Sequence, residues 1–519
     1  MTFEYKPYDF IPPPGLANPE PRKPVVIVGA GPIGLAMAIE LANHDQPSVI
    51  LDDNNVVSVG SRAICWSKRS LEIFERLGIA DRALAKGVTW QVGRTFHRDK
   101  EVFSYDLLPE DGHKMPAFIN LQQYYVEQFL IERAQRSALI DLRFSNKVTN
   151  VDNSTNGVIL DIETPDGAYA LEADYVLACD GARSPVRGML GLEFEGEFFE
   201  ERFLIADIEM DADFPPERHF WFEPKFHEGQ SALLHKQPDN IYRIDLQLGW
   251  HANPDHEMKP EVVIPRIIKV VGHSNFRLDW VSVYSFQCRR LASFVHDRVI
   301  FVGDSAHVVS PFGARGGNGG MQDVDNLGWK LAAILKGHGS AALLDTYNTE
   351  RVQGADENIA NSARATKFMT PADGIERLFR DQVLVLAGHA EFARHWVNAG
   401  RLSKPCTYRL EAPDDPRLPD GARPGAVAPD APLGLDWLTS LLGGEPVILA
   451  LGRDAPALSG VRVLQPEISR TLRKRYLGEE DGAFYLVRPD QVIGARWVDA
   501  HADEIANAVA DLWAGVTCR

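Results

Sequence analysis

The 519-residue sequence predicts an α/β protein in which a parallel-sheet, nucleotide-binding domain is interrupted by an antiparallel sheet. Three observations predict this class. Near the N-terminus, a strand, a glycine turn, a helix and a second strand follow one another within about 30 residues. Two later segments repeat the pattern of a buried strand followed by glycine, and the chain between them alternates like antiparallel strands. A chain of this length exceeds one ordinary core, so several packed units are expected.

The first βαβ unit begins at residues 24–28, a β-branched run suited to a buried parallel strand. A helical pattern runs from about residue 32 to 42, and residues 48–51 form the second strand. Between strand and helix lies the pattern G-x-G-x-x-G, which is typical of a Rossmann-like dinucleotide fold. The residues that this unit assigns to the dinucleotide are Gly29, Gly31, Pro32, Ile33, Gly34, Asp52 and Asp53.

Each glycine of this turn has a separate physical role. Gly29 permits the tight turn, Gly31 lets a pyrophosphate approach the backbone, and Gly34 allows close contact between helix and strand. The phosphate charge then lies at the positive end of the helix. Asp52 ends the second strand at the distance expected for the acid that binds the ribose hydroxyls.

Two later strands end in the same way. Residues 175–178 lead to Asp180-Gly181, and residues 298–302 lead to Gly303-Asp304. The stretch 194–289 between them carries the alternating strands, of which 241–248 is the clearest. Arg243, Asp245 and Gln247 share one face of that strand.

Beyond the second of these strands, apolar positions recur at helical spacing from 319 to 335. A proline-rich linker, 413–432, then precedes strands at 447–451 and 483–487 and a closing helix at 502–512. The expected organisation is an N-terminal extension (1–22), a first part of the nucleotide-binding domain (23–193, with elements of the inserted domain around 88–118), the inserted sheet domain (194–290), a second part with a helical region (291–412), and the linker with a C-terminal unit (413–519).

Composition excludes several classes of function. The net charge of −18 argues against a nucleic-acid partner, because phosphate-binding surfaces are basic. The five cysteines are dispersed and contain no C-x-x-C pair, which disfavours a zinc or dithiol centre and fits a reducing compartment. No His/Glu spacing typical of a metal site occurs. Without an apolar leader or spanning segment, we expect a cytoplasmic protein that does not contact a membrane.

Three motifs, in order between about Pro24 and Gly400, carry a family resemblance: the glycine turn described above and two later segments. The segment 298–307, with Pro311-Phe312-Gly313 and 316–323, resembles the flavin-ribityl motif of the single-component FAD-dependent aromatic hydroxylases. The segment 179–187 resembles their Asp-Gly motif, which touches both FAD and NAD(P)H. The C-terminal unit resembles the thioredoxin-like domain of longer phenol-hydroxylase relatives, although it has no paired cysteines and Cys518 stands alone.

The resemblance implies FAD as the cofactor and assigns further residues to it. Asp304 accepts hydrogen bonds from ribityl hydroxyls, and amides at Gly316 and Gly317 stabilise charge at flavin N1/O2 as the ring is reduced. Arg62 and Gln123 match family positions near the cofactor, with ordinary surface residues as the alternative. The full implied set comprises Arg62, Gln123, Asp180, Gly181, Gly303, Asp304, Pro311, Gly316, Gly317 and Asn318.

The family's reaction would use NADH or NADPH to reduce FAD, after which O2 adds at flavin C4a and the hydroperoxide hydroxylates a phenolic ring. No second glycine-rich βαβ unit is present for the nicotinamide coenzyme, as in the family. The expected partners are therefore a small phenolic substrate and O2, and the protein is expected to form a homodimer.

The substrate base departs from the pattern of the phenol hydroxylases. Where those relatives carry an aspartate, this sequence has Ile64. Arg243 and Asp245 together offer a substitute that orients a phenol, and the alternative is an exposed charge pair on the outer face of the sheet. Trp221 and His235 are candidates for lining the substrate site, against a purely structural role in the core.

Two rival functions remain open at this stage. One is an FAD-dependent oxidoreductase of the same fold that does not insert oxygen, such as a halogenase or a dehydrogenase. The sequence contains no W-x-W-x-I-P segment of the halogenase kind. The other is a non-catalytic flavin-binding redox sensor, with the C-terminal unit as its interaction module.

Overall fold

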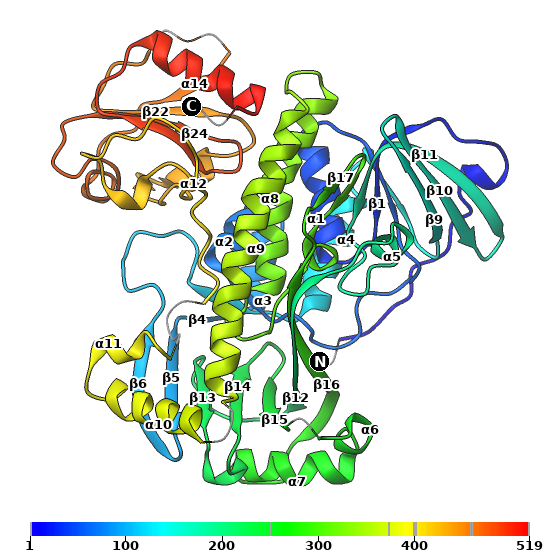
Figure 1. The fold of residues 1–519 in the computed structure, drawn as a ribbon, viewed down its shortest axis with the longest axis vertical. Helices are drawn as coiled ribbons and strands as arrows, with labels where there is room; N and C mark the ends of the chain where they lie inside the picture. The colour runs from blue at the N-terminus through cyan, green and yellow to red at the C-terminus, as the bar shows by residue number, and fades with distance from the viewer. Residues whose placement is uncertain are drawn as a thin grey trace.

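The computed structural model describes residues 3–249, 251–371, 374–397, 402–456, 458 and 460–516, with the backbone alone at 198–200. Cys518 lies outside this range. The described chain forms a mixed α/β structure in which two eight-stranded sheets lie side by side and a smaller sheet closes the C-terminal end (Figure 1). None of its described helices combines the length and apolarity needed to cross a bilayer.

The first sheet holds the predicted nucleotide-binding strands. Its main path runs β17-β18-β11-β1-β2-β8, and the five strands from β18 to β8 are parallel. Helices α1 and α8 pack on each other against this sheet, and α4 packs on α1. The elements of this layer are β1 (Lys23–Val28), α1 (Pro32–Asn43), β2 (Ser48–Leu51), α4 (Gln123–Ala134), β8 (Ile140–Arg143), β9 (Lys147–Ser154), β10 (Gly157–Thr164), β11 (Gly167–Ala178), α5 (Pro185–Met189), β17 (Val295–His296) and β18 (Val299–Phe301).

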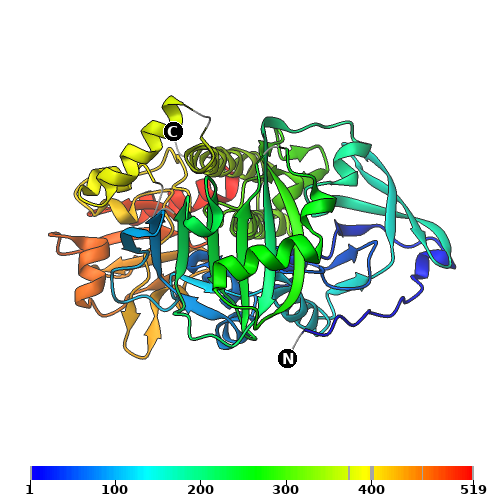
Figure 2. The same ribbon diagram turned by 90° about the horizontal axis from the view of Figure 1, so that it is seen from below.

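The second sheet is the predicted insert, and Figure 2 shows it from below with α7 lying across its outer face. Its strands pair antiparallel except β13 with β5. β5 and β6 come from the chain around residues 88–118. The elements are β5 (Val92–His97), β6 (Lys100–Asp106), β12 (Glu195–Glu209), β13 (Arg218–Phe222), β14 (Ser231–Lys236), β15 (Ile241–Gln247), α6 (Pro254–Glu257), α7 (Pro260–Val271), β16 (Arg277–Arg290) and β19 (His307–Val308).

A three-stranded sheet and several helices connect these layers. The order of the small sheet is β3-β7-β4. Helix α8 begins at Gly316, three residues before the predicted start, because its glycine-rich first turn lacks the apolar periodicity that marks the rest. The connecting elements are β3 (Cys65–Ser67), α2 (Lys68–Arg76), α3 (Ala80–Lys86), β4 (Val88–Trp90), β7 (Phe118–Asn120), α8 (Gly316–Leu335), α9 (Ala342–Met369), α10 (Ile375–Ala387) and α11 (Glu391–Arg394).

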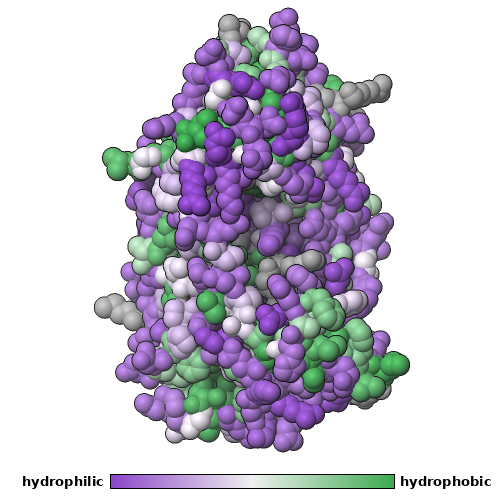
Figure 3. Space-filling model, turned by 90° about the vertical axis from the view of Figure 1, so that its left-hand side faces the viewer, coloured by the Kyte–Doolittle hydropathy of each residue, from purple (hydrophilic) through white to green (hydrophobic). Residues whose placement is uncertain are grey.

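Apolar side chains gather on the outer surface of α10 and the segment after it. Figure 3 shows apolar surface in the lower part of this side of the molecule. Phe379 and Trp396 make an edge-to-face contact, with ring centroids 5.9 Å apart, and both are more than half exposed. Such a concentration of exposed apolar side chains marks an interaction surface more often than isolated ones do.

The C-terminal unit is a four-stranded sheet in the order β23-β22-β24-β25, with β24 antiparallel to both neighbours. Its assignment as thioredoxin-like stays a prediction. The segment expected to be a linker packs into this unit, because Leu418, Ala422, Ala428 and Ala431 are buried in its core. Its elements are β20 (Pro432–Leu433), β21 (Asp436–Trp437), α12 (Leu438–Leu441), β22 (Val447–Leu451), β23 (Arg462–Leu464), α13 (Arg470–Leu472), β24 (Ala483–Val487), β25 (Ile493–Trp497) and α14 (Ala502–Ala514).

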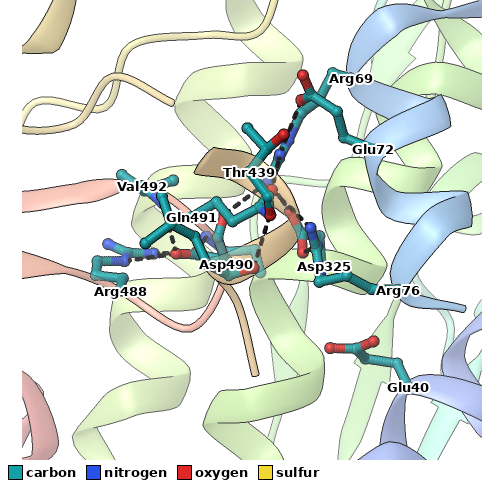
Figure 4. Close-up of polar contacts among 12 residues, drawn as sticks. Glu40, Arg69, Glu72, Arg76, Asp325, Thr439, Arg488, Asp490, Gln491 and Val492 are labelled. Atoms are coloured by element: carbon teal, nitrogen blue, oxygen red, sulfur yellow. Dashed lines mark hydrogen bonds and ion pairs between the residues drawn. The ribbon is translucent and has the colours of Figure 1, made fainter. Parts of the chain in front are cut away.

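The turn between β24 and β25 is held by buried charged groups of α2 and α8. Figure 4 shows this turn facing α2 and α8. The Arg69 guanidinium of α2 donates to Gln491 Oε1 over 2.6 Å and to the Asp490 carbonyl over 2.7 Å. It also pairs with Asp325 of α8. Arg69 is 3% exposed, so the C-terminal unit and the nucleotide-binding domain share a polar interior here.

Candidate functional site

The glycine turn between β1 and α1 has the close contacts that its sequence predicts. A Cβ atom at Gly29, where φ is +107°, would lie 2.5 Å from the carbonyl oxygen of Cys179, the residue after β11. At Gly34 it would lie 1.9 Å from the Gly29 carbonyl oxygen. At Gly31 it would meet nothing within 4 Å. Gly29 and Gly34 therefore serve packing, and Gly31 opens the backbone to the space at the start of the helix, beside Pro32 and Ile33.

Asp52 holds this turn in place. Its Oδ2 accepts a hydrogen bond from the Ala30 amide over 2.5 Å, and its Oδ1 accepts from the Asn54 amide over 2.8 Å. Burial raises the pKa of Asp52 in spite of these bonds. Each oxygen keeps a lone pair, so the carboxylate can also accept from a ribose hydroxyl. The neighbouring Asp53 is exposed and bonds only its neighbour Asn54 among the described residues.

The segment after β11 presents an unsatisfied acceptor. Asp180 Oδ2 accepts from Ser184 Oγ over 2.8 Å and from the Val186 amide over 3.0 Å. Its Oδ1 is buried and has no partner among the described residues. Burial raises the pKa of this carboxyl. Beside it, Gly181 has a φ of +80° and open space where a side chain would be, so this segment is shaped to receive a polar group.

The Gly303-Asp304 turn after β18 is held by a buried aspartate of α8. Asp323 Oδ2 accepts from the Gly303 amide over 2.9 Å and contacts His307 Nε2 at 2.7 Å. Arg351 Nε donates to Asp323 Oδ1 over 2.5 Å. Burial opposes the charge, but His307 and Arg351 outweigh it and lower the pKa of Asp323 to about 2. His307 is thus part of the support of the turn.

Asp304 itself is left available to a ligand. Its side chain is open to solvent, and no group in the described chain donates a hydrogen bond to it. Surrounding protein atoms still raise its pKa by desolvation. A carboxylate without protein donors at the end of a parallel strand suits the ribityl hydroxyls that the sequence assigns to it.

Replacing Asp323 with asparagine is expected to remove about 2.5 kcal/mol of folding stability at pH 7, as the lowered pKa implies. A carboxyl whose pKa falls on folding stabilises fully above its unfolded value of 3.8 and loses this contribution as pH falls through about 2. The gap between wild type and variant in urea unfolding should therefore shrink between pH 4 and pH 2. A gap that stays constant over this window would contradict the assignment.

The first turn of α8 approaches the loop that follows β2. The amides of Gly316 and Gly317 are among the first of the helix, which have no partner within it. A Cβ at Gly317 would lie 3.3 Å from the Trp66 ring. Asn318 uses its side chain internally: Oδ1 accepts from the Ser67 amide over 2.9 Å, and Nδ2 donates to the Cys65 carbonyl over 2.8 Å. Asn318 therefore joins α8 to β3, and its side chain is buried.

Gln123, the first residue of α4, contacts the loop at residues 58–63, and Arg62 is part of that loop. Gln123 Oε1 accepts from the Ala63 amide over 3.1 Å, and its Nε2 donates to Glu127 over 2.7 Å. Glu127 in turn accepts from the Ser58 amide over 2.5 Å. Burial raises the pKa of both Glu127 and Asp304, and the charge of the exposed Arg62 side chain offsets part of this rise at each of them. Gln123 shapes the loop that presents Arg62.

Arg243 and Asp245 lie under this loop on the inner face of the second sheet. Arg243 Nε donates to Asp245 Oδ1 over 2.9 Å, and its Nη1 donates to the carbonyls of Ser61 and Arg62 over 2.8 and 3.0 Å. The two residues are 5% and 9% exposed, so they are not the exposed pair on an outer face that the sequence left as the alternative. The pair therefore connects the sheet to the loop that carries Arg62.

The two residues predicted to line the substrate site, Trp221 and His235, lie on opposite faces of the second sheet. His235 pairs in register with Arg243, so both point to the inner face. Trp221 pairs with Ala232 and packs among the apolar side chains under α7 on the outer face. Trp221 is three positions from Arg218 along β13, so the two side chains point to opposite faces of the sheet, and Trp221 packs half-buried against the apolar cluster of the outer face. Pro311 is exposed in the loop between β19 and α8.

The sheet face holds a carboxylate that sequence patterns did not single out. Asp207 of β12 is 2% exposed and pairs in register with Arg243. Ser61 Oγ donates to it, and Gln237 Nε2 donates over 3.3 Å. Burial raises the pKa of Asp207 to about 6. A lone aspartate on a strand has no motif around it, so only the register reveals this position.

One group of three potential metal ligands occurs in the described chain, formed by His97, Glu223 and Asp381. Arg380 already donates to both carboxylates, and Arg377 donates to Glu223 over 2.5 Å. Two guanidinium groups occupy the position that a cation would need. This group is best described as an ion-pair cluster that joins α10 to the second sheet.

Comparisons with known proteins agree with this geometry. The 3-(3-hydroxy-phenyl)propionate/3-hydroxycinnamic acid hydroxylase of Mycolicibacterium smegmatis is 27% identical over 362 residues, 69% of this chain and 64% of the relative. The matched region is therefore just under two thirds of that relative's length. A flavin-dependent monooxygenase of Mycobacteroides abscessus is 29% identical over 493 residues, 91% of this chain and 96% of the relative.

Solved structures share the fold. The flavin-dependent monooxygenase PieE, in complex with FAD and substrate, has a TM-score of 0.79 at 22% identity, covering 95% of this chain and 99% of its own. The p-nitrophenol 4-monooxygenase PnpA of Pseudomonas putida DLL-E4 has a TM-score of 0.65 at 24% identity, covering 73% and 98%. A family model described as "FAD binding domain" matches residues 22–362, more than half of the chain. The chain thus belongs to this FAD-binding family, and FAD is its cofactor.

Proposed function

We propose that the protein is a monooxygenase that uses NADH or NADPH and O2 to hydroxylate a phenolic aromatic compound. One observation carries this proposal. Two of the parts suited to FAD, Asp304 and the first turn of α8, lie beside the same loop, 58–63, that rests on Arg243: Arg62 acts electrostatically on Asp304, and a Cβ at Gly317 would lie 3.5 Å from the Ala63 side chain. The cofactor region and the polar face of the second sheet thus adjoin, as a reaction between flavin and substrate requires.

The residues present fit FAD at several independent points. Open space at Gly31 admits a phosphate to the helix N-terminus, and the buried Asp180 Oδ1 needs a donor. The Asp304 carboxylate is free for hydroxyl groups. When bound, FAD supplies hydride acceptance and oxygen activation, and the protein's task is to bind, orient and exclude water.

The Arg243–Asp245 pair is proposed to orient the phenol. The pair is buried, and Arg243 is already directed toward backbone carbonyls of the loop. Asp245 Oδ1 accepts a hydrogen bond from Arg243, which leaves Oδ2 able to accept one from the phenol hydroxyl. Such a bond makes the ring more electron-rich, which favours electrophilic attack on it.

Replacing Asp245 with asparagine is expected to lower kcat by about 100-fold and to change the pH profile of kcat, because an amide cannot take up a proton. The measurement is product formation across pH 5–9. Asp255→Asn, at an exposed position on α6, serves as the control and should behave like wild type. Unchanged turnover with an unchanged pH profile would exclude Asp245 as the group that activates the phenol.

Substrate-stimulated NAD(P)H oxidation tests the proposed function as a whole. A hydroxylase should oxidise NADH or NADPH faster when a phenol is present and should form one hydroxylated product per coenzyme consumed. Coenzyme oxidation without oxygenated product would favour an oxidoreductase that does not insert oxygen. If no phenol in a panel of mono- and dihydroxylated aromatics accelerates flavin reduction, a redox-sensing role becomes the better interpretation.

We further propose that the protein forms a homodimer through the apolar surface of α10. The exposed side chains that support this are Ile375, Leu378, Phe379, Val385, Leu386, Phe392 and Trp396. An isologous pair would cover this surface in both copies at once. Sedimentation velocity of the purified protein decides between monomer and dimer.

A further inference from the structure

A row of polar side chains crosses the inner face of the second sheet. In register, Asp207 of β12 pairs with Arg243 of β15, and Arg243 pairs with His235 of β14. The pairing of His219 with Leu234 places Arg218 of β13 beside His235. These strands are neighbours in the sheet, and alternation puts all four side chains on the same face.

One end of this row is electrostatically complete. Asp207 accepts from Ser61 and Gln237, and Arg243 is paired with Asp245 over 2.9 Å. Arg243 also donates to two loop carbonyls. Every charge at this end therefore has a partner from the protein itself.

The other end is incomplete. No carboxylate among the described residues forms an ion pair with Arg218, whose guanidinium contacts only the Tyr105 hydroxyl at 3.4 Å and the Phe220 ring at 5.8 Å. His235 is 5% exposed, and its Nδ1 is buried without a partner in the described chain. Burial and the nearby guanidinium groups hold the pKa of His235 well below its usual value, so the imidazole is neutral.

This incomplete end lies beside the loops assigned to the cofactor. The His235 and Trp90 rings are 6.4 Å apart in an edge-to-face arrangement. Trp90 packs with Cys65, the first residue of β3 after the loop 58–63, and with Ala314 in the loop before α8. Arg218 lies beside His235 in the register of β13 and β14. The unpaired cation therefore borders an aromatic-lined region next to the first turn of α8.

We propose that Arg218 and His235 bind the carboxylate of an acidic aromatic substrate, so that the enzyme selects phenolic acids over neutral phenols. This assignment rests on the proposed function and specifies its substrate class. A carboxylate would accept from the guanidinium and from the imidazole N–H, which satisfies both residues at once. The half-buried Arg218 guanidinium has no carboxylate partner in the described chain, and the bound acid would supply one.

The test compares acids with their own amides. Three matched pairs keep the phenol and change only the charged group: 3-hydroxybenzoate, 3-hydroxycinnamate and 3-(3-hydroxyphenyl)propionate, each with its carboxamide. Dissociation constants come from the change in flavin absorbance without NAD(P)H, and kcat and KM from product formation. Wild type is expected to bind at least one acid about 10-fold or more tightly than its amide.

In Arg218→Gln, Kd and KM for that acid should rise roughly 10- to 100-fold. The Kd and KM for the amide should change little, and so should kcat. Arg218→Lys should recover part of the loss. Arg277→Gln is the matched control, because Arg277 is an exposed arginine of the same sheet, paired with Glu209. His235→Asn should weaken acid binding less than Arg218→Gln does, since it removes no charge.

Two results would overturn the assignment. Equal binding of acid and amide by wild type in all three pairs would show that no anion site operates. An equal loss for acid and amide in Arg218→Gln would place Arg218 at the phenol instead of at a carboxylate. Failure of the proposed function is distinct from both, because it would appear as normal acid-selective binding without hydroxylated product.

Discussion

Replacing Gly31 with valine is expected to abolish FAD binding while the protein still folds. The position has nothing within 4 Å of a Cβ atom, so the apoprotein can accept a side chain there. We propose that the FAD phosphate approaches the start of α1 through the same space, and an isopropyl group would displace it. Overpacking of this kind costs about 1–3 kcal/mol and the lost phosphate contact adds to it, so FAD affinity should fall by at least about 100-fold.

The measurement is FAD content after gel filtration, together with circular dichroism of the purified variant. Gly34→Val is the instructive contrast, because its Cβ would lie 1.9 Å from the Gly29 carbonyl oxygen and must disturb the βα packing itself. Gly421→Val is the neutral control, since that glycine is exposed and also has no neighbour within 4 Å. A Gly31→Val protein that purifies with full FAD would refute the assignment of this turn.

Local sequence patterns were sufficient to predict this part of the molecule. The strand at residues 48–51 and the C-terminal strands at 447–451 and 483–487 have the predicted bounds, because short β-branched runs bounded by turn residues leave little choice. The G-x-G-x-x-G pattern assigns Gly29 and Gly34 their roles, whereas the Cys179 carbonyl that Gly29 approaches follows β11 and lies outside this βαβ unit.

What the sequence could not predict depends on long-range pairing. Trp221 lies under α7 and His235 faces the cofactor side because of strand register, which no local pattern specifies. The row from Arg218 to Asp207 likewise exists only once four strands are aligned. Asn318 lies in the predicted motif, yet its side chain binds Cys65 and Ser67 of β3, which are far from it in the chain.

The buried polar contacts of the C-terminal unit were also beyond prediction. Arg488 donates to Glu350 of α9 through two bonds of 2.7 and 2.8 Å, and its Nε donates to Asp490 over 3.0 Å. Lys330 of α8 donates to the same Glu350 over 2.9 Å. From sequence these residues resemble ordinary surface charges, but all are buried where the β24–β25 turn meets α8 and α9.

Replacing Arg488 with methionine is expected to destabilise the protein by about 3–5 kcal/mol, because it leaves the buried carboxylates of Glu350 and Asp490 without their main partner. Chemical denaturation at pH 7 measures this change. Arg417→Met removes an exposed pair with Asp415 in the same unit and should leave the unfolding midpoint unchanged.

A double-mutant cycle with Glu350→Gln separates the ion pair from other effects of the substitution. Glu350→Gln alone leaves Arg488 and Lys330 with excess positive charge, so it should also destabilise. The double variant should be more stable than the sum of the single changes predicts, by about 1–3 kcal/mol. Strict additivity would mean that the two residues do not depend on each other.

The same network connects the C-terminal unit to the cofactor. Helix α8 carries Lys330 and Asp325 along its length and, at its first turn, the glycines that we propose to face the flavin. Its position is set partly by the β24–β25 turn. If that turn holds α8, heating should release FAD at the temperature at which the C-terminal unit unfolds, and Arg488→Met should lower both temperatures together. Flavin fluorescence reports the first event, and fluorescence of a variant whose tryptophans are kept only in that unit reports the second. Release of FAD well before the C-terminal signal changes would instead show that the cofactor site stands independently of this unit.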